Sequence, residues 1–164
     1  MMIRLSKLFL VACVALFALL VGVDNILDYQ PNFEAVQHIL SMDTIPRDST
    51  LLWRSITNDR LHHLAYWLII AIEIVSGLIC AFGAWRLYGA LQLDGRSFNN
   101  RKSIATLGLV TIFVLYFLGF MVVGGEWFQM WRSEEWNEQE GAFRFIGCIG
   151  LILLYVRQPD TDRV

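Results

Sequence analysis

Charged residues are scarce in this chain. Aspartate, glutamate, lysine and arginine make up 17% of its 164 residues, whereas hydrophobic residues make up 56%. Soluble globular domains carry about a quarter charged residues, so this composition excludes an ordinary soluble domain. The formal net charge is −2 and no basic patch is interleaved with aromatic residues, so the sequence predicts no nucleic-acid partner.

Cysteines are also few, and their placement does not suit redox chemistry. Cys13, Cys80 and Cys148 all lie in apolar stretches and form no C-x-x-C pair. A membrane thiol oxidoreductase needs accessible cysteines of low pKa. The sequence also lacks a Gly-rich phosphate loop, a G-x-S-x-G nucleophile elbow and an internal repeat. These absences argue against an enzyme, although scattered polar residues in a membrane could form a site that leaves no motif.

The chain instead contains long apolar blocks, at 8–23, 64–85, 104–123 and 142–156. About 20 apolar helical residues cross the bilayer hydrocarbon, which is about 30 Å thick. The last block is shorter, but Arg144 near its start can extend its guanidinium to the head groups. The blocks predict an all-α membrane protein of one domain, 1–164. We expect a four-helix transmembrane bundle, up-down-up-down, with spans near 4–24, 62–88, 103–123 and 142–157.

The first block could also be a signal peptide, because Arg4 and Lys7 precede an apolar run that contains a lipoprotein-like box at Cys13. Only about five apolar residues separate Lys7 from Cys13, fewer than the 7–15 or so of a signal peptide. The chain then stays apolar to Val23. We therefore expect a retained helix.

Charge is distributed unevenly among the loops. The segment 24–62 holds six acidic and three basic residues, and 124–144 holds five acidic and two basic residues. Basic residues gather instead near the N-terminus and in the second loop: Arg4, Lys7, Arg86, Arg96, Arg101 and Lys102. Because lysine and arginine concentrate in cytoplasmic loops, we expect both termini and the loop 93–102 to be cytoplasmic.

The two acidic loops carry short amphipathic patterns. Phe33, Val36 and Ile39 share one helical face after Asn32, a plausible N-cap, and similar pieces occur at 48–56 and 126–136. Five of the six tryptophans lie in or beside these loops: Trp53, Trp67, Trp127, Trp131 and Trp136. We expect short amphipathic helices here, forming an aromatic belt at the membrane surface or a lid over the bundle.

Four motifs together resemble a known family: HILSMDT (38–44), LHHLAYW (61–67), GEWFQMW (125–131) and AFRF (142–145). They are similar to the bacterial proteins grouped as predicted small integral membrane proteins, domain of unknown function 2165. The resemblance covers nearly the whole chain and implies a four-helix, multi-pass protein of the bacterial inner membrane. It implies no catalytic residue.

An acidic residue, Glu73, lies near the middle of the second predicted span. Helical periodicity places it on one stripe with His62, Tyr66, Gly77, Cys80 and Ala84, opposite Leu68, Ile72, Val75 and Ile79. We expect the Glu73 stripe to face the bundle interior and the aliphatic face to contact lipid. A charged residue at the bilayer centre costs at least ~2.5–3.5 kcal/mol, which makes Glu73 a candidate functional residue. The alternative is a structural hydrogen bond to Thr111 or Ser76.

The histidines are weaker candidates for a site. Adjacent side chains on a helix point about 100° apart, so His62 and His63 cannot easily bind one ion together. His38 and Met42 are four residues apart and could share a soft metal or a haem edge, with Asp43 and Glu126 as oxygen ligands. The chain has no H-x-x-E-H-like spacing. We therefore predict no cofactor and keep metal or haem binding as an alternative.

Three functions remain open. The first is an accessory or interaction subunit that docks on a larger membrane protein through its tryptophan-rich outer face. Besides the lipid bilayer, the expected partners are this larger membrane protein or, as a homo-oligomer, a second copy of the chain. Small residues on the last two predicted spans motivate it, because they let helices approach closely. The second is a small proton-linked transporter that uses Glu73, with His62 and Tyr66 as a relay. The third is a metal- or haem-binding membrane subunit.

Overall fold

The computed structural model describes residues 1–161, so the last residues of the predicted domain, 162–164, lie outside the described part. Every regular element in the described part is a helix. The long helices are α1 (Met2–Leu27), α2 (Tyr29–Ser41), α3 (Asp59–Tyr88), α4 (Gly95–Val114), the π-helix η2 (Leu115–Trp127) and α5 (Gln139–Arg157). Two short 3-10 helices lie between them: η1 (Leu52–Arg54) between α2 and α3, and η3 (Met130–Arg132) between the π-helix and α5. The predicted all-α fold is confirmed.

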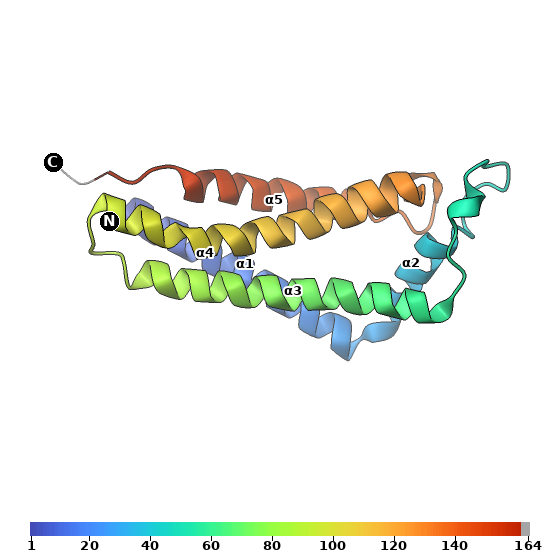
Figure 1. The fold of residues 1–164 in the computed structure, drawn as a ribbon, viewed down its shortest axis with the longest axis horizontal. Helices are drawn as coiled ribbons and strands as arrows, with labels where there is room; N and C mark the ends of the chain where they lie inside the picture. Colours follow the sequence, from blue (N-terminus) through green and yellow to red (C-terminus); the bar gives the residue numbers. More distant parts are fainter. Residues whose placement is uncertain (162–164) are drawn as a thin grey trace.

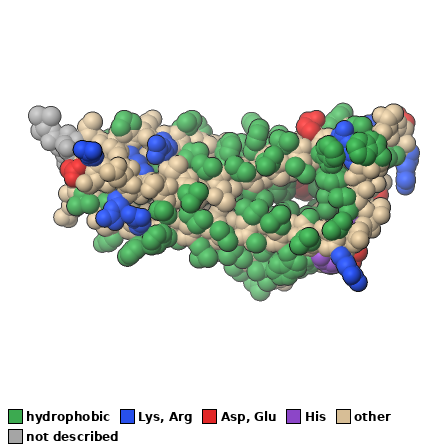
Figure 2. All heavy atoms as spheres, viewed as in Figure 1, with side chains coloured by type: hydrophobic (Ala, Val, Ile, Leu, Met, Phe, Trp, Pro, Cys, Tyr) green, Lys and Arg blue, Asp and Glu red, His purple; other side chains and the backbone are tan. Residues whose placement is uncertain are grey.

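Four helical segments are long and apolar enough to cross a membrane. They are Met2–Leu27, Asp59–Tyr88, Gly95–Trp127 and Gln139–Arg157. Each contains one of the four predicted spans and extends beyond it by a few residues, and the third also includes the π-helix. Figure 2 shows hydrophobic side chains along the length of the bundle, with most lysine and arginine side chains toward its two ends.

The bundle is elongated and its two ends differ (Figure 1). The N-terminus, the α3–α4 connection and the end of α5 lie at one end, called here the terminal end. The Arg4 side chain links two of these parts by donating to the Leu91 carbonyl oxygen at 3.2 Å. The opposite end, called the loop end, carries α2 and the connections that precede α3 and α5.

Two helices begin at capping side chains. The Asn58 side chain accepts a hydrogen bond from the Arg60 N–H at 3.0 Å, and the Asp94 carboxylate accepts one from the Ser97 N–H at 2.8 Å. Each supplies a partner that the first turn of a helix lacks. The predicted N-cap role of Asn32 is wrong, because α2 begins at Tyr29 and Asn32 lies inside the helix.

The amphipathic helices predicted for the acidic loops form only in part. α2 is a helix of 13 residues that buries Phe33 and Ala35. It ends at Ser41 and is followed by its C-cap Met42, which has a φ of 52°. The pattern at 48–56 yields the single 3-10 turn η1, and the region after Trp127 yields the single turn η3. Such short turns have too few backbone hydrogen bonds to continue without tertiary support.

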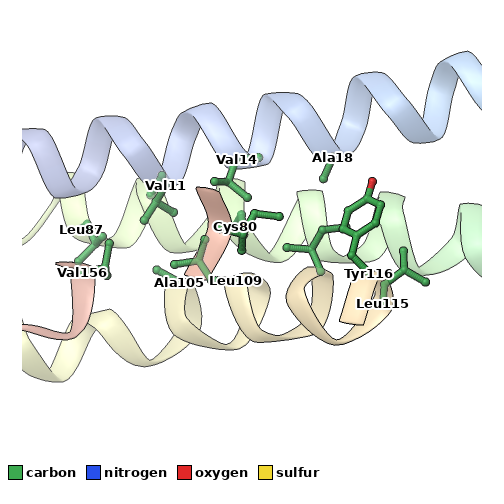
Figure 3. Packing of buried hydrophobic residues seen from close by; sticks show 14 of the residues in the cluster. Val11, Val14, Ala18, Cys80, Leu87, Ala105, Leu109, Leu115, Tyr116 and Val156 are labelled. Atoms are coloured by element: carbon green, nitrogen blue, oxygen red, sulfur yellow. The ribbon is translucent and has the colours of Figure 1, made fainter. Parts of the chain in front are cut away.

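Glycines set how closely the helices pack at the terminal half. A Cβ atom on Gly83 of α3 would lie 2.6 Å from the Ala105 backbone of α4, and one on Gly108 would lie 2.8 Å from the Cys80 nitrogen. Side chains from the helices fill the remaining space, including Val11 and Val14 of α1 and Leu109 of α4 (Figure 3). The terminal half of the bundle is therefore closely packed.

The helices separate toward the loop end. α3 packs along α4 but barely touches the π-helix that continues α4, and Figure 1 shows the two diverging. α2 packs across the loop end of α3. Cavities form in the space that this divergence opens.

Candidate functional site

The Glu73 side chain is buried in the bundle, with 2% of its surface exposed. The other members of its predicted stripe are buried as well: His62, Tyr66, Gly77, Cys80 and Ala84. On the opposite face Leu68 and Val75 are exposed, at 59% and 50%. Ile72 and Ile79 are exceptions, because both are half-buried and Ile72 packs against the edge of the core. The predicted orientation of this helix is therefore confirmed.

Asn25 of α1 is the hydrogen-bond donor to Glu73. Its Nδ2 lies 2.8 Å from Glu73 Oε2, and its Oδ1 accepts from Asn32 Nδ2 at 2.8 Å. The structural partners expected from the sequence are wrong. Thr111 donates to the Leu107 carbonyl oxygen of its own helix, and Ser76 donates to backbone oxygens of α3.

Two buried tyrosines flank this chain of polar side chains. The Tyr66 hydroxyl donates to the Asn25 carbonyl oxygen at 3.3 Å. The Tyr116 hydroxyl, on the π-helix, faces the Glu73 carboxyl group and interacts with it electrostatically. Figure 3 shows this hydroxyl pointing from the π-helix toward α1 near Ala18. A tyrosine hydroxyl that donates to a carboxylate can still accept a hydrogen bond, so the Tyr116 oxygen is a candidate contact for a ligand.

These side chains line a cavity of about 160 Å³, called here the Glu73 cavity. Its walls come from α1, α2, α3, the π-helix and the start of α5, and Glu138 lies at its loop-end side. The rings of Tyr66, Tyr116, Phe120 and Phe145 also line it. None of the described lining residues is lysine or arginine. The cavity therefore combines carboxyl groups, aromatic rings and tyrosine hydroxyls.

The predicted relay from His62 to Glu73 does not form among the described residues. His62 is buried, and its Nε2 lies 2.7 Å from the Ile56 carbonyl oxygen. Its Nδ1 has no hydrogen-bond partner in the described part of the chain. Tyr66 bonds to the backbone of α1 rather than to either side chain. His62 thus anchors the segment before α3 and lies outside the Glu73 cavity.

His63 belongs to an aromatic cluster at the loop end. Its ring stacks on Phe33 with centroids 4.1 Å apart, and its Nδ1 lies 2.8 Å from the Tyr29 hydroxyl. Burial raises the pKa of Tyr29, and the charge of Asp59 raises it further. The cluster fixes α2 against α3, so His63 has a packing role here.

His38 and Met42 do not share a site. His38 Nδ1 lies 3.0 Å from the Asp43 carboxylate, and the ring stacks on Trp136 at 4.7 Å. Met42 is buried instead in an apolar cluster with Ile45 and Phe128. Among residues 1–161, no three His, Cys, Asp or Glu side chains lie close enough together to bind a metal ion.

Two other candidates lie outside the Glu73 cavity. Glu126 is exposed near the end of the π-helix. Arg144 is 72% exposed and pairs with Glu140 one turn earlier on α5, as expected for a guanidinium that extends toward the head groups.

Sequence reasoning missed most of the residues that surround Glu73. Asn25 falls at the end of an apolar block and Tyr116 inside one, so neither interrupts the hydropathy pattern. The signal that could have found Asn25 is its position three residues after Gly22 and seven after Ala18, on the face that α1 buries. Asn32 comes from α2 and Glu138 from the N-cap of α5, and only the tertiary fold brings them near.

A second buried polar cluster lies at the terminal end. Lys7 of α1 and Lys102 of α4 both donate to Asp160 Oδ2 and to the Gln158 carbonyl oxygen. The side chains of the three charged residues are at most 6% exposed. Burial raises the pKa of Asp160, but the hydrogen bonds from Lys102 and Lys7 outweigh burial and hold the pKa below its usual range. This cluster ties the segment after α5 to α1 and α4.

A family model matches residues 3–159 of the chain, with the description predicted small integral membrane protein, domain of unknown function 2165. The match agrees with the resemblance carried by the four sequence motifs. Among the curated proteins and the solved structures, none matches the chain.

Proposed function

The chain belongs to this family of predicted small integral membrane proteins, and from the Glu73 cavity we propose that it binds an organic amine in the membrane as a small proton-linked carrier. The observation that carries the proposal is a buried carboxyl group in an aromatic cavity whose described lining residues include no lysine or arginine. An ammonium group would supply the missing positive charge.

The cavity offers each kind of contact that an ammonium group needs. Asn25 donates to Glu73 Oε2, and an ionised carboxylate has about four lone-pair sites, so Glu73 can accept further N–H groups from a ligand. The Tyr116 hydroxyl oxygen lines the cavity and can accept an N–H. Aromatic faces attract cations by up to about 2 kcal/mol where water is excluded, and four aromatic rings line the cavity.

Proton linkage follows from the chemistry of the carboxyl group. An ammonium ion binds the ionised carboxylate, and a proton competes for the same oxygen. Amine binding at Glu73 should therefore release a proton when the empty carboxyl group is protonated. The close packing of the terminal half supports entry from the loop end, with α2 above the cavity.

The experiment uses the full chain in lipid nanodiscs. Propylamine should raise the midpoint of thermal unfolding, because a ligand that binds only the folded state stabilises it. Propionate, of similar size and opposite charge, should not. In Glu73→Gln the propylamine shift should disappear, since the amide keeps the shape but carries no charge.

A pH-sensitive dye in the same samples should report proton release when propylamine is added to the natural protein, and none in Glu73→Gln. Equal stabilisation of the natural protein and Glu73→Gln by propylamine would refute a site at Glu73. Stabilisation by propionate would refute the charge argument.

A second candidate function, an accessory subunit of a membrane complex, is favoured by α5. Its most apolar stretch is 17% buried, against 33% for the other three spans. A Cβ atom on Gly147 would meet no atom within 4 Å, so another helix could approach closely there. If a membrane protein, or a second copy, docks on this face, Gly147→Leu should abolish its co-purification in mild detergent, whereas Gly119→Leu should not.

We also infer a bacterial inner-membrane location with both termini in the cytoplasm. The basic residues at the terminal end support this orientation, because lysine and arginine concentrate on the cytoplasmic side. The Glu73 cavity would then lie in the outer half of the membrane.

A further inference from the structure

An apolar groove lies beside the Glu73 cavity. It has a volume of about 560 Å³ and is lined by α2, α3, α4 and the π-helix. Val36, Ile39, Ile69 and Phe120 line both the groove and the cavity. The two spaces are therefore separated by shared side chains rather than by a helix. The groove volume lies in the range typical of small-molecule sites, about 300–1,000 Å³.

The groove exists because α3 and the π-helix diverge. Gly119 and Gly124 of the π-helix contribute no side chains to fill the gap, and Ala65 contributes a small one on α3. π-helical turns occur frequently at functional sites, because the extra residue per turn changes which side chains face inward. Here the π-helix places Tyr116 in the Glu73 cavity and Gly119 in the groove.

The open side of the groove faces the hydrocarbon of the membrane. Its lining includes Leu68, Val110 and Leu118, which are exposed apolar residues on spanning helices. Figure 2 shows the surface hollowed between α3 and the helix that continues α4. A molecule that fills the groove must therefore be apolar, and it can enter from the bilayer.

We propose that the ligand is a long-chain amine, with its alkyl chain in the groove and its ammonium group at Glu73. This inference rests on the proposed function and names its ligand class. The charge of the two linings selects the head group. The acidic residues among them are Glu73 and Glu138, and no described lining residue is basic, so a phosphate or carboxylate head would meet repulsion. A phospholipid thus fits the groove with its chain but not the cavity with its head.

The experiment compares dodecylamine with propylamine in nanodiscs that contain the natural protein or single variants. Ala65→Phe fills the groove, and Ala71→Phe is its matched control, because Ala71 lies on the same helix and is exposed outside both cavities. Gly119→Leu is a second blocking variant. A Cβ atom there meets only Leu115, at 3.7 Å, so the helix can accept it without a clash.

The expected result is that dodecylamine binds the natural protein at least tenfold more tightly than propylamine, after subtraction of its uptake by Glu73→Gln nanodiscs. Ala65→Phe and Gly119→Leu should reduce dodecylamine binding at least tenfold and leave propylamine binding unchanged. Ala71→Phe should change neither. Dodecanoate, with the same chain and an anionic head, should show no Glu73-dependent binding.

The outcomes separate the two proposals. If propylamine binds at Glu73 but the blocking variants leave dodecylamine binding unchanged, the groove proposal fails and the proposed function stands. If neither amine depends on Glu73, both fail. Native mass spectrometry can also detect phospholipid that co-purifies with the protein. If this phospholipid is lost in Ala65→Phe but is not displaced by dodecylamine, the groove binds ordinary lipid and the proposal is overturned.

Discussion

At the scale of single residues, Glu73 shows how a polar group is accommodated inside a membrane bundle. It lies on the third helix in the chain, but its hydrogen-bond donor, Asn25, comes from α1 and is fixed in turn by Asn32 of α2. The carboxyl group thus connects three helices. The Tyr116 hydroxyl faces the same carboxyl group from the π-helix, and all four side chains line one cavity.

The hydrogen bond itself should contribute little to stability. Glu73→Gln keeps an oxygen that accepts from Asn25, so its free energy of unfolding should match that of the natural protein. Glu73→Leu leaves the Asn25 amide unpartnered and should cost on the order of 1 kcal/mol, as membrane hydrogen bonds do. Unfolding in mixed detergent micelles measures both. A double-mutant cycle with Asn25→Leu measures the coupling energy of the pair, and a value well above 1 kcal/mol would contradict this small contribution.

Asp160 should matter more, because two buried ammonium groups depend on one carboxylate. Asp160→Asn should lower the free energy of unfolding at pH 7 by about 3–5 kcal/mol, the usual effect of breaking a buried pair. Asp48→Asn is the control. Its ion pair with Arg132 spans 3.4 Å and Asp48 is 83% exposed, so little change is expected.

The pH dependence of stability should also show the contribution of Asp160. The pKa of Asp160 is lowered in the folded protein, so its stabilising effect is complete above the unfolded pKa, about 3.9. That effect is lost as the pH falls through the folded pKa. Between about pH 5 and 2 the natural protein should therefore lose stability more steeply than Asp160→Asn. Parallel profiles in thermal unfolding would exclude a role for Asp160.

At the scale of elements, the two halves of the bundle differ in how closely α3 is packed. α3 packs closely on α4 in one half, and it diverges from the π-helix that continues α4 in the other half. Glycines at the contact points allow the backbones to approach. The π-helix then continues α4 with a different periodicity, so that the next turns face a cavity rather than α3. The position of the change in helix type decides where the bundle opens.

Substitution of a contact glycine should separate the two helices. A Cβ atom on Gly83 would overlap the Ala105 backbone at 2.6 Å, so Gly83→Ala should lower the free energy of unfolding by about 1–3 kcal/mol. Gly147→Ala is the matched control. It meets no atom within 4 Å, and the higher helix propensity of alanine should leave stability equal or slightly raised. Detergent unfolding compares them, and equal loss in both variants would contradict the packing argument.

At the scale of the whole molecule, the difference between the two ends sets the expected topology. Lys7, Lys102 and Arg4 lie at the terminal end, whereas the acidic loops lie at the loop end. These basic side chains should lie on the cytoplasmic side of the membrane. This orientation would present α2 and the Glu73 cavity to the outer side.

Cysteine labelling in intact cells tests the orientation. After the native cysteines are replaced, an impermeant reagent should label Glu134→Cys at the loop end and should fail to label Asn100→Cys near the terminal end until the cells are opened. Both positions are exposed. Labelling of Asn100→Cys alone in intact cells would invert the orientation and place the cavity in the inner half of the membrane.

The sequence by itself determined the class of the protein, the four spans and the face of α3 that turns inward. Composition and helical periodicity suffice for these features, because the bilayer requires about 20 apolar residues per span and because the period of a helix fixes which residues share a face. Glu73 could be found in this way, because a single acidic residue within an apolar block is recognisable in the sequence alone.

Only the tertiary structure decided what surrounds that acid. Asn25, Asn32 and Tyr116 come from three other helices, and no local pattern records their distance from Glu73. The same holds for the π-helix and for the Lys7–Asp160–Lys102 cluster, which joins residues far apart in the chain. Hydropathy reports how much a segment prefers lipid. Which polar groups meet inside the bundle depends on how the helices pack against one another, and here glycine contacts and the divergence of α3 from the π-helix fix that packing.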